Sequence, residues 1–207
     1  MILEVADLSV KKNKSKSKFQ INLWVVKISI ITFVLSIFFS SISETLVKKF
    51  NLIVAFIVLL IIVLIGIVFD IIGIAVTAAS EIPFHAMSSD KVPGARESVK
   101  LIRNADIVSN FCNDVIGDIA GIISGAAGAA IILRVVFFYP DISKTVLSVI
   151  MSGIIATLTV AGKAIGKGIA LTNSHNIVHR AGLFLFFLKQ TFGIEILKVN
   201  NGKKPRK

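Results

Sequence analysis

The stretch LIVAFIVLLIIVLIGIVFDIIGIAVTAA, residues 52–79, decides the fold class of this chain. Apart from Asp70 and Thr77, every residue in it is apolar or small. A membrane core about 30 Å thick needs about 20 helical residues, so this stretch can cross a bilayer and still tilt or project beyond it. It therefore predicts a transmembrane helix.

The composition of the whole chain points the same way. Of its 207 residues, 55% are hydrophobic and 17% are charged, and the mean hydropathy is +0.85. These values lie outside the range of soluble globular domains and predict an all-α integral membrane protein. The single cysteine, Cys112, excludes an internal disulfide and any metal site built from several cysteines.

Three further apolar segments, at residues 23–43, 115–139 and 145–165, are long enough to cross a bilayer as helices. The sequence thus predicts four transmembrane helices. Residues 1–22 are rich in lysine and serine and are expected to form a disordered basic arm. Residues 190–207 are expected to form a basic cytosolic tail.

Basic residues are unevenly distributed along the chain, whose net charge is +11. Both termini are rich in lysine, whereas the two short loops on the opposite side hold only Lys48, Lys49 and Lys144. Because basic flanks stay on the cytosolic side, we expect a multi-pass protein of the plasma membrane with both termini cytosolic. Such a basic excess also attracts anionic lipid. Nucleic-acid binding is not expected, because no basic stretch is interleaved with aromatic residues.

Two segments outside the spans have amphipathic patterns. Between the second and third spans, Val99, Ile102 and Val108 recur at helical spacing, which predicts a cytosolic belt helix at about residues 94–112. After the fourth span, NSHNIVHRAGLFLFFLK at residues 173–189 has a basic polar side and a side rich in leucine and phenylalanine. Its uninterrupted apolar run is too short for a fifth span, so we expect it to be interfacial or packed on the bundle.

Polar residues in or beside the spans are the candidates for a site. Asp70 lies in the second span, Asp118 lies in the third, and Asn113 and Asp114 come just before the third. A charge at the bilayer centre costs about 3 kcal/mol on insertion scales, so these side chains would face a partner, a cavity or an ion pathway. Alternatively, Asp70 and Asp118 lie near the cytosolic interface, where most of that cost disappears.

Gly117, Gly121 and Gly125 recur every four residues along the third span. Such a stripe of small residues lets a second helix approach closely, within a monomer or across a dimer. We therefore predict helix packing along it.

The histidines and nucleophiles of the chain give no sign of catalysis. His175 and His179 are four residues apart but lack the glutamate of the zinc-protease pattern, and His85 has no evident partner in the sequence. There is no nucleophile–base pairing, zinc motif or phosphate-binding loop, so we do not expect an enzyme.

Three stretches, taken in order, carry a resemblance. FDIIGIAVTAASE lies at residues 69–81, GARESVKLIRNADIVSNFCNDVIGD at residues 94–118 and GKAIGKGIALTNSHNIVHRAGLFL at residues 162–185. The last resembles the end of the transmembrane domain of CorB/CorC and cyclin-M-type magnesium transporters, whose pattern is roughly Gly-Glu-x-x-Pro-Lys-x-x-Ala. Gly162, Lys167 and Ala170 match it in register. The first two are similar to a Phe-Ser-Gly-Ser-Glu-like helix end and a Gly-Ala…Leu-x-Asn-Pro segment that leads into an Ile-Gly-Asn helix.

The resemblance covers about residues 52–185 and implies three transmembrane helices and a belt helix that form a homodimer. In that family a dehydrated Mg²⁺ is held by side-chain and backbone oxygens, and the resemblance implies no other cofactor. Residues 23–51 would then be an additional first helix and loop, and residues 52–189 the CorB/CorC-like domain. The paired nucleotide-binding regulatory domains of many family members are not expected in this chain.

The resemblance places Lys163 where the family has its ion-binding glutamate, Asp70 where it has serine, and Asp118 near its Gly-Asn pair. Mg²⁺ prefers a shell of oxygen ligands, and a lysine ammonium has no lone pair to donate. Lys163 would therefore pair with one of the aspartates in the space of the ion. Alternatively, Lys163 extends to the cytosol beside Lys167.

Two functions follow. The chain is a minimal, divergent transporter of Mg²⁺ or a similar divalent cation, with a site formed by Asp70, Asp118, Asn113 and Asp114. Alternatively, it is a transport-inactive membrane scaffold or partner subunit whose former ion site is filled by Lys163.

Overall fold

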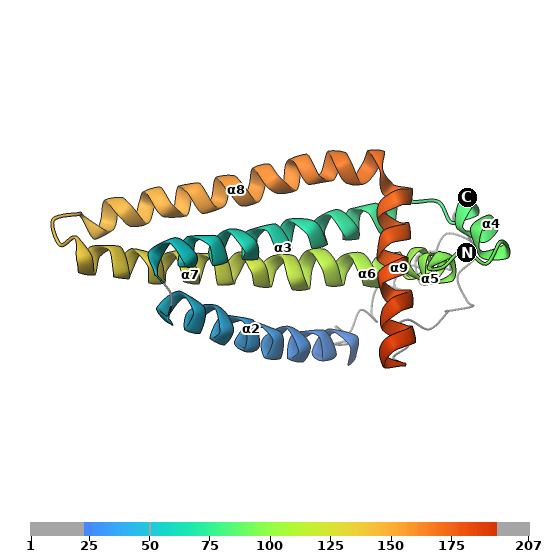
Figure 1. The fold of residues 1–207 in the computed structure, drawn as a ribbon, viewed down its shortest axis with the longest axis horizontal. Coiled ribbons are helices and arrows are strands. Elements are labelled where there is room, and N and C mark those ends of the chain that lie inside the picture. The colour runs from blue at the N-terminus through green and yellow to red at the C-terminus, as the bar shows by residue number, and fades with distance from the viewer. Residues whose placement is uncertain (1–22, 50, 194–207) are drawn as a thin grey trace, which may run out of the picture. The chain divides into compact units, whose positions relative to one another are not determined.

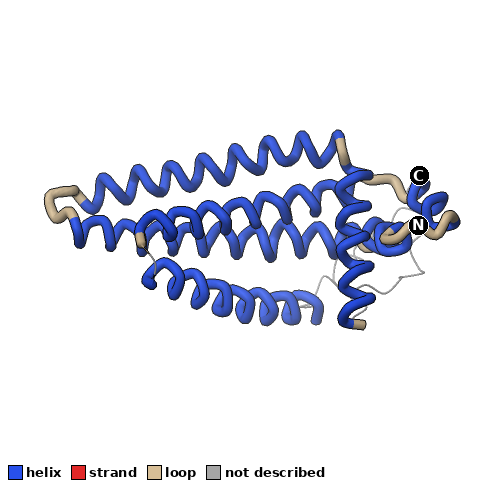
Figure 2. Tube along the Cα trace, in the orientation of Figure 1, coloured by secondary structure: helices blue, strands red, loops and turns tan. Residues whose placement is uncertain are grey.

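The computed structural model describes residues 23–49 and 51–193, and within them every regular element is a helix (Figures 1 and 2). The predicted basic arm at residues 1–22 and most of the predicted tail at residues 190–207 lie outside the described residues. The elements are α2 (Leu23–Lys49), α3 (Leu52–Ala78), α4 (Ile82–Ser89), α5 (Ala95–Arg103), α6 (Ala105–Asn110), the π-helix η1 (Phe111–Gly117), α7 (Asp118–Phe138), α8 (Lys144–Thr172) and α9 (Ser174–Phe192).

Four of the described helical segments are long and apolar enough to cross a membrane, as the sequence predicts. The chain is therefore an all-α membrane protein. The described residues divide into two units, and the boundary between them falls within α2, between Val34 and Leu35. The second unit contains α3 to α9 and holds the candidate site.

Three long rods run side by side in the second unit: α3, the rod α6–η1–α7, and α8 (Figure 1). Their shared core is formed by small and branched apolar side chains, among them Leu59, Val63 and Ile131. α8 approaches α3 closely because Gly162 and Gly166 face Ile67 and Ile71. The missing side chains at those two glycines leave room for the isoleucines. The sequence pointed to Gly162 only through the family resemblance and did not predict this packing role.

The third rod is longer than predicted. Its helical residues extend from Ala105 to Phe138, and η1 widens the helix at Phe111–Gly117. The predicted belt helix at residues 94–112 is therefore two elements, because the chain leaves helical geometry at Asn104 and α5 ends at Arg103. Residues 105–112 belong to the membrane rod.

A second hydrophobic core lies where the end of α3 meets α4, α5 and α9. Phe84, Val76 and Val178 are almost fully buried there. α5 and α9 cross in close backbone contact, since a methyl group at Gly182 would lie only 2.6 Å from the Gly94 carbonyl oxygen. The buried Ser98 hydroxyl donates to the Gly94 carbonyl oxygen at 2.9 Å and lies 3.2 Å from that of Val178. This crossing fixes α9 against the ends of the rods.

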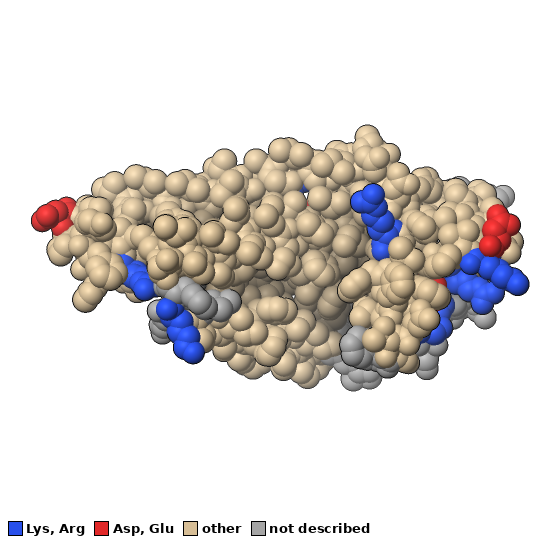
Figure 3. Space-filling model, in the orientation of Figure 1, with Lys and Arg blue, Asp and Glu red and all other residues tan. Residues whose placement is uncertain are grey.

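The outer surfaces of α3, α7 and α8 are apolar over most of their length, as expected for helices that face lipid. Ile57, Leu64, Ile122, Val149 and Leu158 are examples of large exposed side chains. On the face drawn in Figure 3, charged side chains lie toward the two ends of the bundle, most of them around α4 and α5. Few lie along α8 between them.

Candidate functional site

An ion pair joins α3 to α8 toward the α9 end of the bundle. Lys163 Nζ lies 3.8 Å from Asp70 Oδ1, and the Asp70 side chain is 13% exposed and that of Lys163 32%. Of the two sequence interpretations, the structure shows the one in which Lys163 contacts an aspartate. The contact is too long for a direct hydrogen bond, so it acts through charge.

The third rod closes the site from the other side. A methyl group at Gly117 would lie 3.5 Å from Lys163 Nζ, so the ammonium rests against bare backbone there. Gly73, one turn beyond Asp70 on α3, faces the Asn113 side chain. The Asn113 Oδ1 atom is buried and has no hydrogen-bond partner among the described residues. A buried acceptor without a partner costs about 1–3 kcal/mol. Asn113 also lies on η1, the kind of helix irregularity that is frequent at functional sites.

Asp70, Asp118 and Lys163 lie at a similar depth. Asp70 is 18 residues after Leu52, Lys163 is 19 after Lys144, and Asp118 is 20 before Phe138. At 1.5 Å per residue these separations are about 27–30 Å, which is the thickness of a hydrocarbon core. For helices whose far ends lie at one membrane boundary, this separation puts the three residues near the other, at the α9 end, where the cost of a charge falls steeply.

The four residues predicted to line a cation site are not equally placed. Asp70 faces Lys163 on α8 and the Asn113 side chain faces Gly73 on α3, whereas Asp114 and Asp118 are exposed. Among the described residues, no three side chains of His, Cys, Asp or Glu lie close enough to hold a metal ion together. A metal held here would have to combine Asp70 with amide or backbone oxygens.

Of the three glycines predicted to pack against another helix, only Gly117 has a neighbour in the described chain. A methyl group at Gly121 or Gly125 would meet no described atom within 4 Å. The closely packed glycine of this helix is instead Gly128, which faces Ile155. The four-residue stripe follows one face of α7, but the approach of α8 occurs on another.

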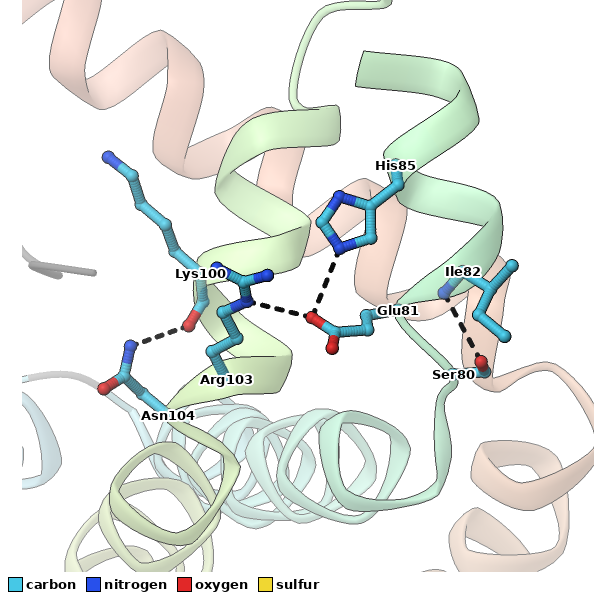
Figure 4. Close-up of polar contacts among 7 residues, drawn as sticks. All are labelled: Ser80, Glu81, Ile82, His85, Lys100, Arg103 and Asn104. Carbon is cyan, nitrogen blue, oxygen red and sulfur yellow. Dashed lines mark hydrogen bonds and ion pairs between the residues drawn. The ribbon is translucent and has the colours of Figure 1, made fainter. Parts of the chain in front are cut away.

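A second polar cluster joins α4 to α5 outside the spans. Arg103 Nε donates to Glu81 Oε2 at 3.0 Å, and His85 Nε2 lies 3.4 Å from the same oxygen (Figure 4). The hydrogen bond from Arg103, with a smaller contribution from His85, outweighs burial and lowers the pKa of Glu81 below its ordinary value of 4.5. Sequence analysis left His85 without a partner. The i, i+4 spacing of Glu81 and His85 was the available signal.

The other two histidines serve the packing of α9. His175 stacks on Phe84 with ring centroids 6.0 Å apart, and His179 Nε2 lies 3.3 Å from the Pro93 carbonyl oxygen. Both rings thus contact the α4–α5 region.

Comparison of the chain with protein-family models, with curated proteins and with solved structures finds no match.

Proposed function

We propose that this protein is a membrane scaffold or partner subunit with a CorB/CorC-like transmembrane domain, in which a lysine ammonium occupies the position of the transported cation. The observation that carries the proposal is the contact of Lys163 with Asp70. The Lys163 ammonium lies beside the partly buried Asp70 carboxylate, and a divalent cation would have to displace it.

The neighbours of the pair support this proposal. Gly117 presents backbone to the ammonium, so the Lys163 side chain lies against the third rod as well as beside Asp70. Asp114 and Asp118, which could have supplied further carboxylates, are exposed. Mg²⁺ requires a nearly complete octahedron of oxygens. The described side chains near the ion pair offer it one carboxylate, that of Asp70, and one amide, that of Asn113.

The test is metal binding by purified protein in detergent, measured as the shift of the melting temperature on adding Mg²⁺ or Co²⁺. We expect no shift for the wild type and a metal-dependent rise for Lys163→Glu, which places a second carboxylate beside Asp70. Lys167→Glu is the matched control, because Lys167 lies one turn further along α8 and is exposed. Tight Mg²⁺ binding by the wild type would refute the proposal.

The second candidate is a divalent cation transporter, and one observation favours it. Asn113 Oδ1 is a buried oxygen without a hydrogen-bond partner among the described residues, and the Asn113 side chain faces Gly73, one turn beyond Asp70 on α3. If Lys163 moved toward solvent, that oxygen and the Asp70 carboxylate would become available to a cation. Mg²⁺ uptake into proteoliposomes, lost in Asp70→Asn and in Asn113→Leu, would establish transport. Absence of uptake by the wild type would exclude it.

For either function, we propose that the protein spans the plasma membrane and that the α9 end of the bundle lies in the cytosol. The described cations at that end include Lys91, Arg96, Arg103 and Arg180. Basic residues are retained on the cytosolic side during insertion. A single cysteine at Asp90, in a Cys112→Ala background, is expected to react with a membrane-impermeant maleimide only after the cells are opened.

The homodimer implied by the resemblance belongs to the same proposal. Gly121 and Gly125 form a small-residue surface without described neighbours on α7, which is compatible with a second copy of the chain. Cross-linking in native membranes, reduced by Gly125→Leu, tests it.

A further inference from the structure

α9 is held to the bundle along one face only. Ser174, Val178 and Gly182 are buried, and these residues recur every four positions on the side that packs against α3 and α5. Because Gly182 lies directly on the α5 backbone, α9 has little freedom to rotate about its axis. The orientation of its other face is therefore fixed by the fold.

That other face is apolar in its second half. The side chains of Phe184 and Phe187 are 64% and 55% exposed, and they are three residues apart, so they lie on the same side of the helix. Arg180, one turn before Phe184, is also exposed on this side. A cation followed by exposed phenylalanines is the pattern of a helix that lies in the membrane interface.

The position of α9 along the rods gives it the depth of the lipid headgroups. α8 has 29 residues and is about 43 Å long, which matches the 40–45 Å of a bilayer with its headgroup layers. α9 begins at Ser174, two residues after α8 ends, and runs across the rods rather than along them (Figure 1). Its width of about 10–12 Å lets side chains reach back toward the acyl chains.

Two neighbours fix which way the open face of α9 points. The buried face packs against both α3 and α5, at the place where α9 crosses the ends of the rods (Figure 1). The opposite face, with Phe184 and Phe187, therefore points away from both helices and is exposed.

We propose that α9 is an interfacial anchor, in which Phe184 and Phe187 insert at the boundary between headgroups and acyl chains and Arg180 binds a phospholipid phosphate. The occupant is the lipid leaflet and not a second copy of the chain. The depth of α9 brings its phenylalanines to the acyl boundary, and the cation beside them complements the phosphate layer rather than an apolar partner.

Tryptophan fluorescence tests the insertion. Trp24 is the single tryptophan, so in a Trp24→Phe background the Phe184→Trp and Phe187→Trp variants each carry one reporter. In phosphatidylcholine vesicles brominated near the headgroup or near the chain end, we expect strong quenching of both reporters, greater with the shallow bromines. Asp90→Trp, at an exposed position after α4, is the control and should be quenched by aqueous acrylamide instead.

The outcomes separate the possible occupants. A Phe184→Trp reporter as open to acrylamide as the Asp90→Trp reporter would overturn the proposal, because that face would be in water. A reporter shielded from both acrylamide and bromine would also overturn it and would indicate a protein contact.

The Arg180 part of the proposal has its own readout. Phosphatidylglycerol added to phosphatidylcholine vesicles is expected to raise the melting temperature of the wild type. Arg180→Gln should show a smaller rise, and Lys91→Gln, an exposed control beyond α4, the same rise as the wild type. An equal rise in Arg180→Gln and the wild type would contradict the phosphate contact.

Discussion

Gly182 offers the sharpest test of how α9 is attached. Its substitution by alanine adds one methyl group at the crossing of α9 with α5. That methyl would overlap the Ser98 hydroxyl oxygen, and it would lie 2.6 Å from the Gly94 carbonyl oxygen and 2.8 Å from the Ser98 nitrogen, whereas ordinary contact begins near 3.4 Å. The hydroxyl can rotate away, but the other two neighbours are backbone atoms, and Gly94 itself has a φ of +80°, which restricts its replacement or rearrangement. The two helices would have to separate by about 0.8 Å, the difference between 3.4 and 2.6 Å.

The expected cost follows from three terms. Overpacking of this kind costs about 1–3 kcal/mol, and displacement of the Ser98 hydroxyl from the Gly94 and Val178 carbonyls costs about 1 kcal/mol more. Replacing glycine by alanine within a helix returns about 1 kcal/mol. We therefore expect Gly182→Ala to lower the free energy of unfolding by about 1–3 kcal/mol, which is a fall in Tm of several degrees at about 2–4 °C per kcal/mol.

Cys112 provides the assay. It is the single cysteine of the chain and is buried, so a dye that fluoresces on reaction with a thiol reports unfolding in detergent. Gly168→Ala is the matched control, because a methyl group there meets no described atom within 4 Å. Its Tm should equal or slightly exceed that of the wild type. If Gly182→Ala is as stable as Gly168→Ala, the close crossing of α5 and α9 is incorrect.

Three further predictions are tested by the melting temperature, which is followed by circular dichroism where the pH is acidic. Phe84→Ala should destabilise the protein by about 3–5 kcal/mol, because Phe84 is 1% exposed, whereas Phe137→Ala, at a lipid-facing position, should leave Tm nearly unchanged in detergent. Gly121→Ala should be neutral or stabilising by up to about 1 kcal/mol, since no described atom is near it, and a large loss would indicate a tight contact on that face. Arg103 lowers the pKa of Glu81 below 4.5, so the stabilisation by this pair is complete above pH 4.5 and is lost as the pH falls through the lowered pKa. The Tm difference between wild type and Glu81→Gln should therefore shrink on acidification below pH 4.5, and a difference that grew would contradict the assignment.

The fold class and the number of spans could be predicted from sequence because they depend on the local density of apolar residues. Residues 52–79 alone required a membrane helix, and the observed α3 (Leu52–Ala78) ends one residue earlier. Boundaries next to polar segments were less predictable. The third rod begins at Ala105, ten residues before the apolar run that announced it, because tertiary contacts with α3 extend the helix into polar sequence.

The candidate site was only partly predictable. The pairing of Lys163 with an aspartate followed from charge, since a lysine in an apolar helix needs an anion or water. Which aspartate it meets depends on the rotation of each rod, and the glycines that set this rotation are Gly162 and Gly166, not the more regular stripe on α7. The four-residue spacing of Gly162 and Gly166 can be read from the sequence, but the sequence does not show that these glycines pack against α3.

The pairing of Lys163 with Asp70 carries the functional proposal, and a double-mutant cycle measures it most directly. Asp70→Asn, Lys163→Met and the double variant would be unfolded by titration with a denaturing detergent. We predict that the two single variants lose, in sum, about 0.5 kcal/mol or more of unfolding free energy beyond the loss in the double variant. For Asp70→Asn combined with Lys167→Met, the losses should be additive. Additivity for Asp70 and Lys163 as well would contradict the contact and remove the basis for a lysine-filled cation position.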